Sequence, residues 1–310
     1  MGQAGSRAFE GTVIRSLTGH SRAVLHCEFS QDGELLATCS ADKSVLLWNV
    51  ETGEPLRSLE GHTDEVTCCC FYENILATCS RDKTVVLWLY KSGRRASRVA
   101  NHSGAVLACT IASTGQYLAT CSEDKTIRLV KFQPGTGAFV NGSEMRRLNG
   151  HRGSVNDVKF SSNANFLASA SQDKTIRLWE IGTGACAMVL DDPFGSVQKL
   201  CYSPTGSHMI SLSSPGNFVS VWNTQTHMID NVLEANDGRE IQNIAISPDG
   251  RITIGLSKDN KITLWAKMTH KCTPELRTTQ HKKGVTAIAI TETDCYVATG
   301  DGEGAVFIWN

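Results

Sequence analysis

The chain has 310 residues, and 30 Lys and Arg against 31 Asp and Glu leave a formal net charge of −1. Hydrophobic residues make up 41% of it and charged residues 20%, which is typical of a globular protein with a substantial core. The near-neutral charge excludes a general attraction to nucleic acid, and no apolar run is long enough for a membrane span or a signal peptide. We therefore expect an intracellular protein, in the cytoplasm in preference to the nucleus, without nucleic acid or membranes as partners.

Short β-rich segments separated by turn residues begin soon after His20. The predicted strands of this first unit are 23–29, 35–40, 45–50 and 55–59. Turns of the Asp-Gly, Asp-Lys and Thr-Gly kind separate them, and this spacing indicates an all-β protein built of antiparallel meanders. No segment has a sustained helical period.

The phrase from Leu36 to Trp48 recurs along the chain, which indicates a repeat architecture. The end points of the copies, at intervals of 40, 42, 49, 43, 43 and 44 residues, are Trp48, Trp88, Val130, Trp179, Trp222, Trp265 and Trp309. A dipeptide that ends in histidine marks the start of five units: Gly19-His20, Gly61-His62, Asn101-His102, Gly150-His151 and Gln280-His281. We count seven units.

These residues resemble the WD40-repeat family over nearly the whole chain, from about Thr12 to Asn310. The resemblance implies an all-β fold, a seven-bladed β-propeller with four-stranded antiparallel blades. The last copy stops on its third strand, so residues 12–18 are expected to complete the last blade and close the ring, which removes an unpaired sheet edge. We therefore expect a flexible tail over residues 1–11 and a single, monomeric propeller over residues 12–310.

The resemblance also implies a structural role for the recurring polar residues. In the family, a histidine, a serine, an aspartate and a tryptophan of one blade form a hydrogen-bond network in which the serine connects the histidine to the indole. A hydrolase needs one triad, whereas this set recurs, so we expect no catalytic residue. The expected members are His20, Ser40, Asp42, Trp48, His62, Ser80, Asp82, Trp88, His102, Ser122, Asp124, His151, Ser171, Asp173 and Trp179. In blades five to seven, where members are replaced, we expect packing to matter more than the network.

Propellers of this family present partner proteins with the top face, built from residues just before the turn aspartates and around the first inner strands. By position, the candidates here are Arg81, Glu65, Glu123, Asn156, Gln172, Gln198, Glu240, Gln242 and Lys258. No aromatic residue occurs in this set, and arginine is enriched among residues that dominate interface energetics. We therefore expect Arg81 to be the main anchor for protein or peptide partners, whose identity the sequence leaves open.

Two further segments are candidate contacts. The basic run 91–98 is expected on the outer strand of the second blade, and its Arg94-Arg95-Ala96-Ser97 matches a basophilic kinase site, so Ser97 is a candidate phosphosite. Residues 133–144, rich in glycine, predict an extended loop beside the third blade.

Twelve cysteines occur, but no Cys-x-x-Cys pair. Cys39, Cys79 and Cys121 share one position of the repeat, and Cys27, Cys69 and Cys109 share another. We therefore expect reduced core thiols in place of disulfides or zinc ligands, with Cys68-Cys69-Cys70 on alternate faces of a strand. No phosphate-binding glycine loop occurs, so no metal and no cofactor are expected.

The sequence thus predicts a non-enzymatic scaffold of a multiprotein complex that binds partner segments on its top face. The alternative is a substrate-recognition or targeting module of a larger enzyme, such as a SAM/U-box ubiquitin ligase. The phrases Cys68-Cys69-Cys70-Phe71 and Leu76-Ala77-Thr78-Cys79-Ser80 are loosely similar to such proteins. Both interpretations depend on the family resemblance, since a fold alone does not fix a function.

Overall fold

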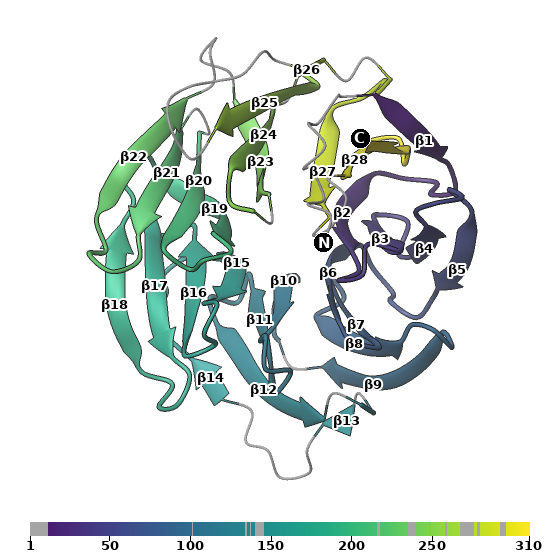
Figure 1. The fold of residues 1–310 in the computed structure, drawn as a ribbon. Helices are drawn as coiled ribbons and strands as arrows, with labels where there is room; N and C mark the ends of the chain where they lie inside the picture. The colour runs from purple at the N-terminus through teal and green to yellow at the C-terminus, as the bar shows by residue number, and fades with distance from the viewer. Residues whose placement is uncertain are drawn as a thin grey trace, which may run out of the picture.

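The computed structural model describes residues 12–100, 102–133, 135–136, 138–139, 146–215, 218–234, 240–247, 249–257, 259–266, 276–277, 280–291 and 296–310. The tail predicted over residues 1–11 lies outside them. All regular structure in these ranges is β, and no helix among them is long and apolar enough to cross a membrane. Seven antiparallel sheets stand around a central axis like the blades of a propeller (Figure 1). The predicted fold class is therefore confirmed.

Each blade runs outward from an inner strand that faces the axis. Blade one comprises β2 (Val24–Phe29), β3 (Leu35–Ser40), β4 (Val45–Asn49) and β5 (Pro55–Leu59). Blade two comprises β6 (Val66–Tyr72), β7 (Ile75–Ser80), β8 (Thr84–Leu89) and β9 (Arg94–Ala100). Blade three comprises β10 (Val106–Ile111), β11 (Tyr117–Ser122), β12 (Ile127–Gln133), β13 (Ala138–Phe139) and β14 (Arg146–Leu148). Blade four comprises β15 (Val155–Phe160), β16 (Phe166–Ser171), β17 (Thr175–Glu180) and β18 (Cys186–Asp191).

The remaining blades follow the same order. Blade five comprises β19 (Ser196–Tyr202), β20 (His208–Ser214), β21 (Phe218–Asn223) and β22 (Ile229–Glu234). Blade six comprises β23 (Ile241–Ile246), β24 (Ile252–Ser257), β25 (Lys261–Ala266) and β26 (Leu276–Arg277). Blade seven comprises β27 (Val285–Ile290), β28 (Val297–Asp301), β29 (Val306–Trp309) and, from the other end of the chain, β1 (Val13–Leu17).

The ring is closed by β1, which pairs antiparallel with β29 from Val13 opposite Trp309 to Leu17 opposite Val306. Leu17 is buried in the same apolar cluster as Trp48 of blade one and Ile308 of blade seven. The first and last described strands therefore share one sheet, and the side chains of β1 join the core between two blades.

Burial of the strands follows their place in the blade. The second strands are buried on both faces, as in β7, because neighbouring blades cover each side. The outermost strand β5 has four exposed residues of five. A buried strand inside the blade and an exposed strand at the rim thus result from the stacking of the blades.

Each inner strand has a bulge one residue after its beginning. In β6, for example, the pairing with β7 shifts between Val66 and Cys68, and the same irregularity occurs in the inner strands of the other six blades. A bulge re-aims the side chain of the extra residue. The positions re-aimed in this way include Thr67, Asn156, Gln198 and Gln242, at the top-face end of the inner strands.

The loop predicted over residues 133–144 is partly a hairpin. β12 continues to Gln133, and its Phe132 pairs with Phe139 of β13. Residues 134, 137 and 140–145 lie outside the described ranges.

Candidate functional site

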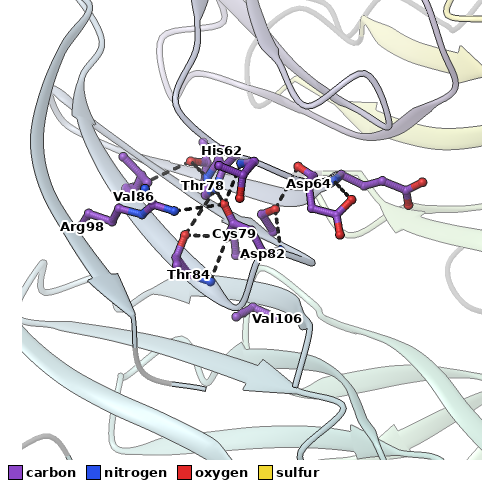
Figure 2. A network of polar contacts seen from close by, with 12 residues as sticks. His62, Asp64, Thr78, Cys79, Asp82, Thr84, Val86, Arg98 and Val106 are labelled. Carbon is purple, nitrogen blue, oxygen red and sulfur yellow. Dashed lines mark hydrogen bonds and ion pairs between the residues drawn. The ribbon is translucent and has the colours of Figure 1, made fainter. Parts of the chain in front are cut away.

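The recurring polar side chains of blade two form a chain of hydrogen bonds beneath the top face. His62 Nδ1 lies 2.9 Å from Asp82 Oδ2, and His62 Nε2 lies 2.9 Å from Thr78 Oγ1 (Figure 2). The indole N–H of Trp88 donates to the same hydroxyl at 2.9 Å. Asp82 also accepts from the Thr84 hydroxyl at 2.6 Å, which fixes the tight turn after β7.

The serine assigned to this network by the sequence analysis is the wrong hydroxyl. Ser80 Oγ donates to the Asp64 carbonyl at 3.0 Å and accepts from the Asp82 backbone N–H at 3.0 Å. It reaches neither the histidine nor the indole, because Ser80 ends its strand beside the turn whereas Thr78 lies one pleat deeper. Ser40, Ser122 and Ser171 likewise accept from the backbone N–H of Asp42, Asp124 and Asp173.

The hydroxyl that contacts the histidine stands two residues earlier in each of these blades. It is Thr38, Thr78, Thr120 or Ser169 in blades one to four. Trp48, Trp88 and Trp179 donate to it at 2.9 Å. This hydroxyl recurs in the sequence as regularly as the serine, so both were candidates for the contact with the histidine. Only the geometry at the end of the strand shows which of the two hydroxyls makes it.

The chain of donors and acceptors accommodates a neutral histidine. A carboxylate only accepts, so His Nδ1 carries the proton, and Nε2 is then available to accept from the hydroxyl. Burial lowers the pKa of His102, His151 and His281, which favours this neutral form. Burial opposes the charge of Asp82, yet hydrogen bonds from His62 and Thr84 outweigh it and hold the pKa of Asp82 well below its usual range.

Blade seven has a complete network, although the expected serine and aspartate are replaced there. His281 Nδ1 lies 2.9 Å from Asp301 Oδ2, and Thr299 Oγ1 lies 2.8 Å from His281 Nε2 and 2.7 Å from Trp309 Nε1. Asp301 stands at the serine position and also accepts from the backbone N–H groups of Glu303 and Ala305. The Asp301 carboxylate thus accepts both the hydrogen bond from the histidine and those from the turn backbone, which the turn aspartate and the serine share in the other blades.

Blades five and six depart further. In blade five Asp192 takes the place of the histidine: it accepts from Ser211 Oγ at 3.0 Å, and Ser211 accepts from Trp222 Nε1 at 2.9 Å. Blade five thus keeps a polar connection to its indole, with a carboxylate in place of the histidine. In blade six the hydroxyl position is Gly255, and the Trp265 indole donates instead to the Glu234 carbonyl at 3.0 Å.

The top face carries the residues expected to contact partners. Five of them line one depression of about 580 Å³ over blades two to five: Arg81, Glu123, Asn156, Gln172 and Gln198. Lys125 and Arg152, which the sequence analysis did not single out, line the same depression. We call it the top-face depression. Glu240 and Gln242 are exposed further around the ring, and Lys258 lies outside the described residues.

Arg81, the expected anchor, is engaged by two carboxylates. Its Nε lies 3.1 Å from Glu65 Oε2, and its Nη1 lies 3.2 Å from Glu123 Oε1. The side chains are 45%, 31% and 46% exposed, so these ion pairs contribute little to stability. By contrast, Lys125 and Arg152 form no ion pair with any described residue. A carboxylate of a partner therefore meets less competition at these two cations than at Arg81.

Two of the expected contact residues, Asn156 and Gln198, already form hydrogen bonds within the propeller. Asn156 donates its amide to the Val197 carbonyl of the next blade at 2.8 Å, as the Thr67 hydroxyl does to the Val106 carbonyl at 2.7 Å. Gln198 donates to Ser196 Oγ at 2.8 Å. The bulged positions thus connect neighbouring blades as well as facing the depression.

Ser97 lies within β9, where it pairs with Leu87 and is half-buried. Arg98 of the same strand lies 3.3 Å from Asp82 Oδ2. The basic run therefore follows the outer strand of blade two, and one of its arginines reaches the polar network. Phosphorylation of Ser97 stays a prediction.

Ten cysteines are described, and all ten are free thiols. Cys68 and Cys70 pack toward blade three, and Cys69 packs toward blade one, so the expected alternation is confirmed. The fold also brings together what the spacing did not reveal: the sulfur atoms of Cys68, Cys79 and Cys109 all lie within 4.8 Å of one another. We call these three residues the thiol cluster.

The channel at the centre of the ring holds a cavity of about 370 Å³ lined by inner strands. Its carboxylates contact the backbone of the next blade: Glu28 accepts from the Phe71 N–H at 3.2 Å, and Asp157 accepts from the Leu200 N–H at 2.9 Å. Burial opposes the charge of Lys159, but Asp157 foremost outweighs it and raises the pKa of that lysine. The charged side chains that line the channel thus connect neighbouring blades. No recurring motif in the sequence indicated this role.

Comparison with known proteins agrees with this geometry. A family profile described as "WD domain, G-beta repeat" matches residues 11–49, 53–88, 93–131, 142–180 and 272–310, together more than half of the chain. The unmatched interval includes most of blades five and six, where the network departs from the common pattern. The WD40 family is in general a non-catalytic interaction module, and no catalytic family is indicated.

Curated relatives match over short stretches. The chain is 45% identical over 62 residues to WD repeat, SAM and U-box domain-containing protein 1 of Gallus gallus, covering 19% of this chain and 13% of that protein. It is 38% identical over 53 residues to eukaryotic translation initiation factor 3 subunit I of Schizosaccharomyces pombe, covering 17% and 16%. It is 48% identical over 48 residues to the Notchless protein homolog of Arabidopsis thaliana, covering 16% and 10%. The matched stretches thus span only a small part of each relative. Seven blades, their repeated network and the profile match lead to one conclusion: this chain belongs to the WD40-repeat family.

Proposed function

We propose that this chain is a non-enzymatic scaffold of a multiprotein complex and that it binds segments of partner proteins mainly at the top-face depression. The observation that carries the proposal is the depression itself, which gathers five of the expected contact residues with two further cations. Rigid blades on every side give such a surface a fixed shape, and a preorganised site binds with a smaller entropic cost.

The charges of the depression favour a partner segment that carries a carboxylate. Lys125 and Arg152 form no ion pair with described residues, whereas Arg81 is balanced by Glu65 and Glu123. Asn156, Gln172 and Gln198 add amide groups that hydrogen-bond to peptide backbone. An extended segment with an acidic side chain near blades three and four fits this arrangement.

The absence of enzymatic activity is also part of the proposal. The histidine and hydroxyl of each network are buried, the aspartate is at least partly buried, and the three are engaged with one another, as in blade two. The same arrangement recurs in four further blades, and its hydroxyl accepts from an indole in most of them. Because the arrangement is repeated and its polar groups already bond to one another, it supports a structural role for these residues.

The test is differential capture from a cell lysate followed by quantitative mass spectrometry. The variant Lys125→Glu with Arg152→Glu removes the two cations. We expect the amount of partner protein captured to fall at least about tenfold, since charged contacts at an interface contribute a few kcal/mol. The matched control is Arg57→Glu with Arg251→Glu, which makes the same change of charge at two exposed residues outside both the depression and the basic run. Equal capture by all three proteins would contradict the proposed site, whereas loss in both variants would indicate non-specific electrostatics.

A second candidate is a targeting module of a larger enzyme. The observation that favours it is the 45% identity over 62 residues to the WD repeat, SAM and U-box protein of Gallus gallus. An antibody against the propeller distinguishes the two: endogenous protein of mass well above 33.6 kDa, with SAM or U-box peptides in its digest, would favour this candidate. Endogenous protein at that mass would exclude it.

We also propose a monomeric, intracellular protein, cytoplasmic in preference to nuclear, without direct binding to nucleic acid or membranes. The ten described free thiols support a reducing compartment. Light scattering of the purified chain measures the oligomeric state, and microscopy of the tagged protein with a nuclear marker measures its location.

A further inference from the structure

Three sulfur atoms meet in the core between blades two and three. Cys68 and Cys79 stand directly opposite each other on the adjacent strands β6 and β7, and Cys109 comes from β10 of the next blade. Their sulfur atoms all lie within 4.8 Å of one another, and the three residues are at most 3% exposed. Three thiols at this separation form a compact set of soft ligands.

The fold produces this meeting through the bulge of β6. The pairing of β6 shifts between Val66 and Cys68, so Cys68 turns toward blade three and lies opposite Cys79. Cys109 then approaches from the facing blade, and its Sγ also lies 3.9 Å from Cys70 Sγ. A fourth sulfur therefore borders the cluster.

The separation of the sulfur atoms suits a metal ion. An ion bound to three thiolates at about 2.3 Å places the sulfurs about 4 Å apart, which lies within the observed limit. Thiolates select thiophilic ions with filled d shells, of which monovalent copper accepts three sulfurs and zinc prefers four.

The thiol cluster borders the cavity at the axis of the propeller. Cys68 lines this channel cavity of about 370 Å³ as well as the cluster, and His26 and Lys159 line the same cavity. The ammonium of Lys159 interacts electrostatically with Cys68 and so offsets part of the negative charge that three thiolates retain around an ion.

We propose that Cys68, Cys79 and Cys109 bind a thiophilic d10 ion, Cu(I) or Zn²⁺, that cross-links blades two and three. On binding of Cu(I), three S–H bonds break, three copper–sulfur bonds form, and three protons pass to the solvent, with no change of oxidation state. On binding of Zn²⁺, Cys70 supplies a fourth sulfur, so four S–H bonds break, four zinc–sulfur bonds form and four protons are released. This site is independent of the partner surface on the top face.

The experiment uses the full chain, purified anaerobically and freed of metal with a chelator. Cu(I) and Zn²⁺ are added separately, and native mass spectrometry counts the ions bound, while ultraviolet absorption detects sulfur-to-metal charge transfer. We expect one ion per chain and a higher Tm in its presence, because a ligand that binds only the folded state stabilises it.

The sharpest comparison is Cys79→Ala against Cys121→Ala. The two cysteines occupy the same position of the repeat and are equally buried, but Cys121 lies outside the cluster. We expect Cys79→Ala and Cys109→Ala to lose the ion and Cys121→Ala to keep it. A stoichiometric ion that Cys79→Ala retains would overturn the proposal, and so would the absence of a bound ion in the wild type.

X-ray absorption of the loaded wild type keeps the proposal testable if a variant fails to fold. Three or four sulfur neighbours at about 2.3 Å support the site, and fewer than three overturn it. Cys70→Ala separates the two ions: zinc binding should weaken at least tenfold, whereas Cu(I) binding should stay within about twofold.

Discussion

The indole of Trp265 occupies the space that a side chain at Gly255 would need. A Cβ added to Gly255 would lie 2.4 Å from Cη2 of the indole. In the other six blades this position is a threonine or serine, and in five of them its hydroxyl accepts from the indole N–H. In blade six the ring thus lies against the strand at the place of the hydroxyl, and the indole N–H donates to the Glu234 carbonyl instead.

Gly255→Thr, which restores the residue of the other blades, should therefore destabilise the protein. The added side chain forces the indole out of its position, and overpacking of this kind costs about 1–3 kcal/mol. Urea denaturation measures the change in the free energy of unfolding. Gly182→Ala is the control, since a Cβ there meets no atom within 4 Å. A neutral Gly255→Thr would mean that the ring can rotate to the position it takes in the other blades.

Thr78→Val should cost more than Thr120→Val. Thr78 contacts both His62 and the Trp88 indole, whereas Thr120 contacts His102 in a blade where Val130 replaces tryptophan. Removing a buried partner costs about 1–3 kcal/mol for each group left unpaired, so we expect roughly 2–6 kcal/mol for Thr78→Val against 1–3 kcal/mol for Thr120→Val. Chemical denaturation of both variants provides the comparison. Equal losses would show that the indole finds another acceptor.

Stability should fall as the pH drops below about 6.5. Burial lowers the pKa of His102, His151 and His281 from 6.5, so the unfolded chain takes up these protons first. Stability then rises with pH across this window, by about 1.4 kcal/mol per pH unit for each proton. The lowered pKa of Asp124 and Asp173 from 3.8 adds a second loss in the same direction at more acidic pH.

The measurement is the free energy of unfolding from urea titrations between pH 8 and pH 5. A plateau above pH 7 followed by a decline below pH 6.5 is expected. A flat profile down to pH 5 would mean that the histidines take up protons in the folded state as readily as in the unfolded chain.

A chain that begins at Gly19 lacks β1 and should be less stable and prone to association. Burial of Leu17, which is 1% exposed, contributes about 1.5–3 kcal/mol alone, and the edge of β29 loses its partner strand. Light scattering and thermal denaturation measure both effects. A chain that begins at Thr12 keeps β1 and is the control. Monomeric, fully stable protein without β1 would show that another segment covers β29.

The fold was predictable because every blade repeats the pattern of short strands and turn residues, and six of the seven end in a tryptophan, with Val130 in the third. The polar networks were less accessible. Asp301 stands two residues from the expected aspartate position, and only the strand-end geometry shows that it reaches both His281 and the turn backbone. The thiol cluster joins residues of two blades, and the ion pairs of Arg81 depend on side-chain directions; neither follows from spacing along one strand.

The pairing of β1 with β29 also sets an order of events during protein synthesis. Val13–Leu17 leaves the ribosome first among the described strands, yet its partner Val306–Trp309 leaves last. Until then β1 has no partner strand, and the apolar side chain of Leu17 stays exposed unless another protein binds it. Blades one to six can form as they emerge, but the circle is completed after translation of the last blade. Nascent chains of this protein should therefore depend on chaperones in proportion to how slowly that last blade is made.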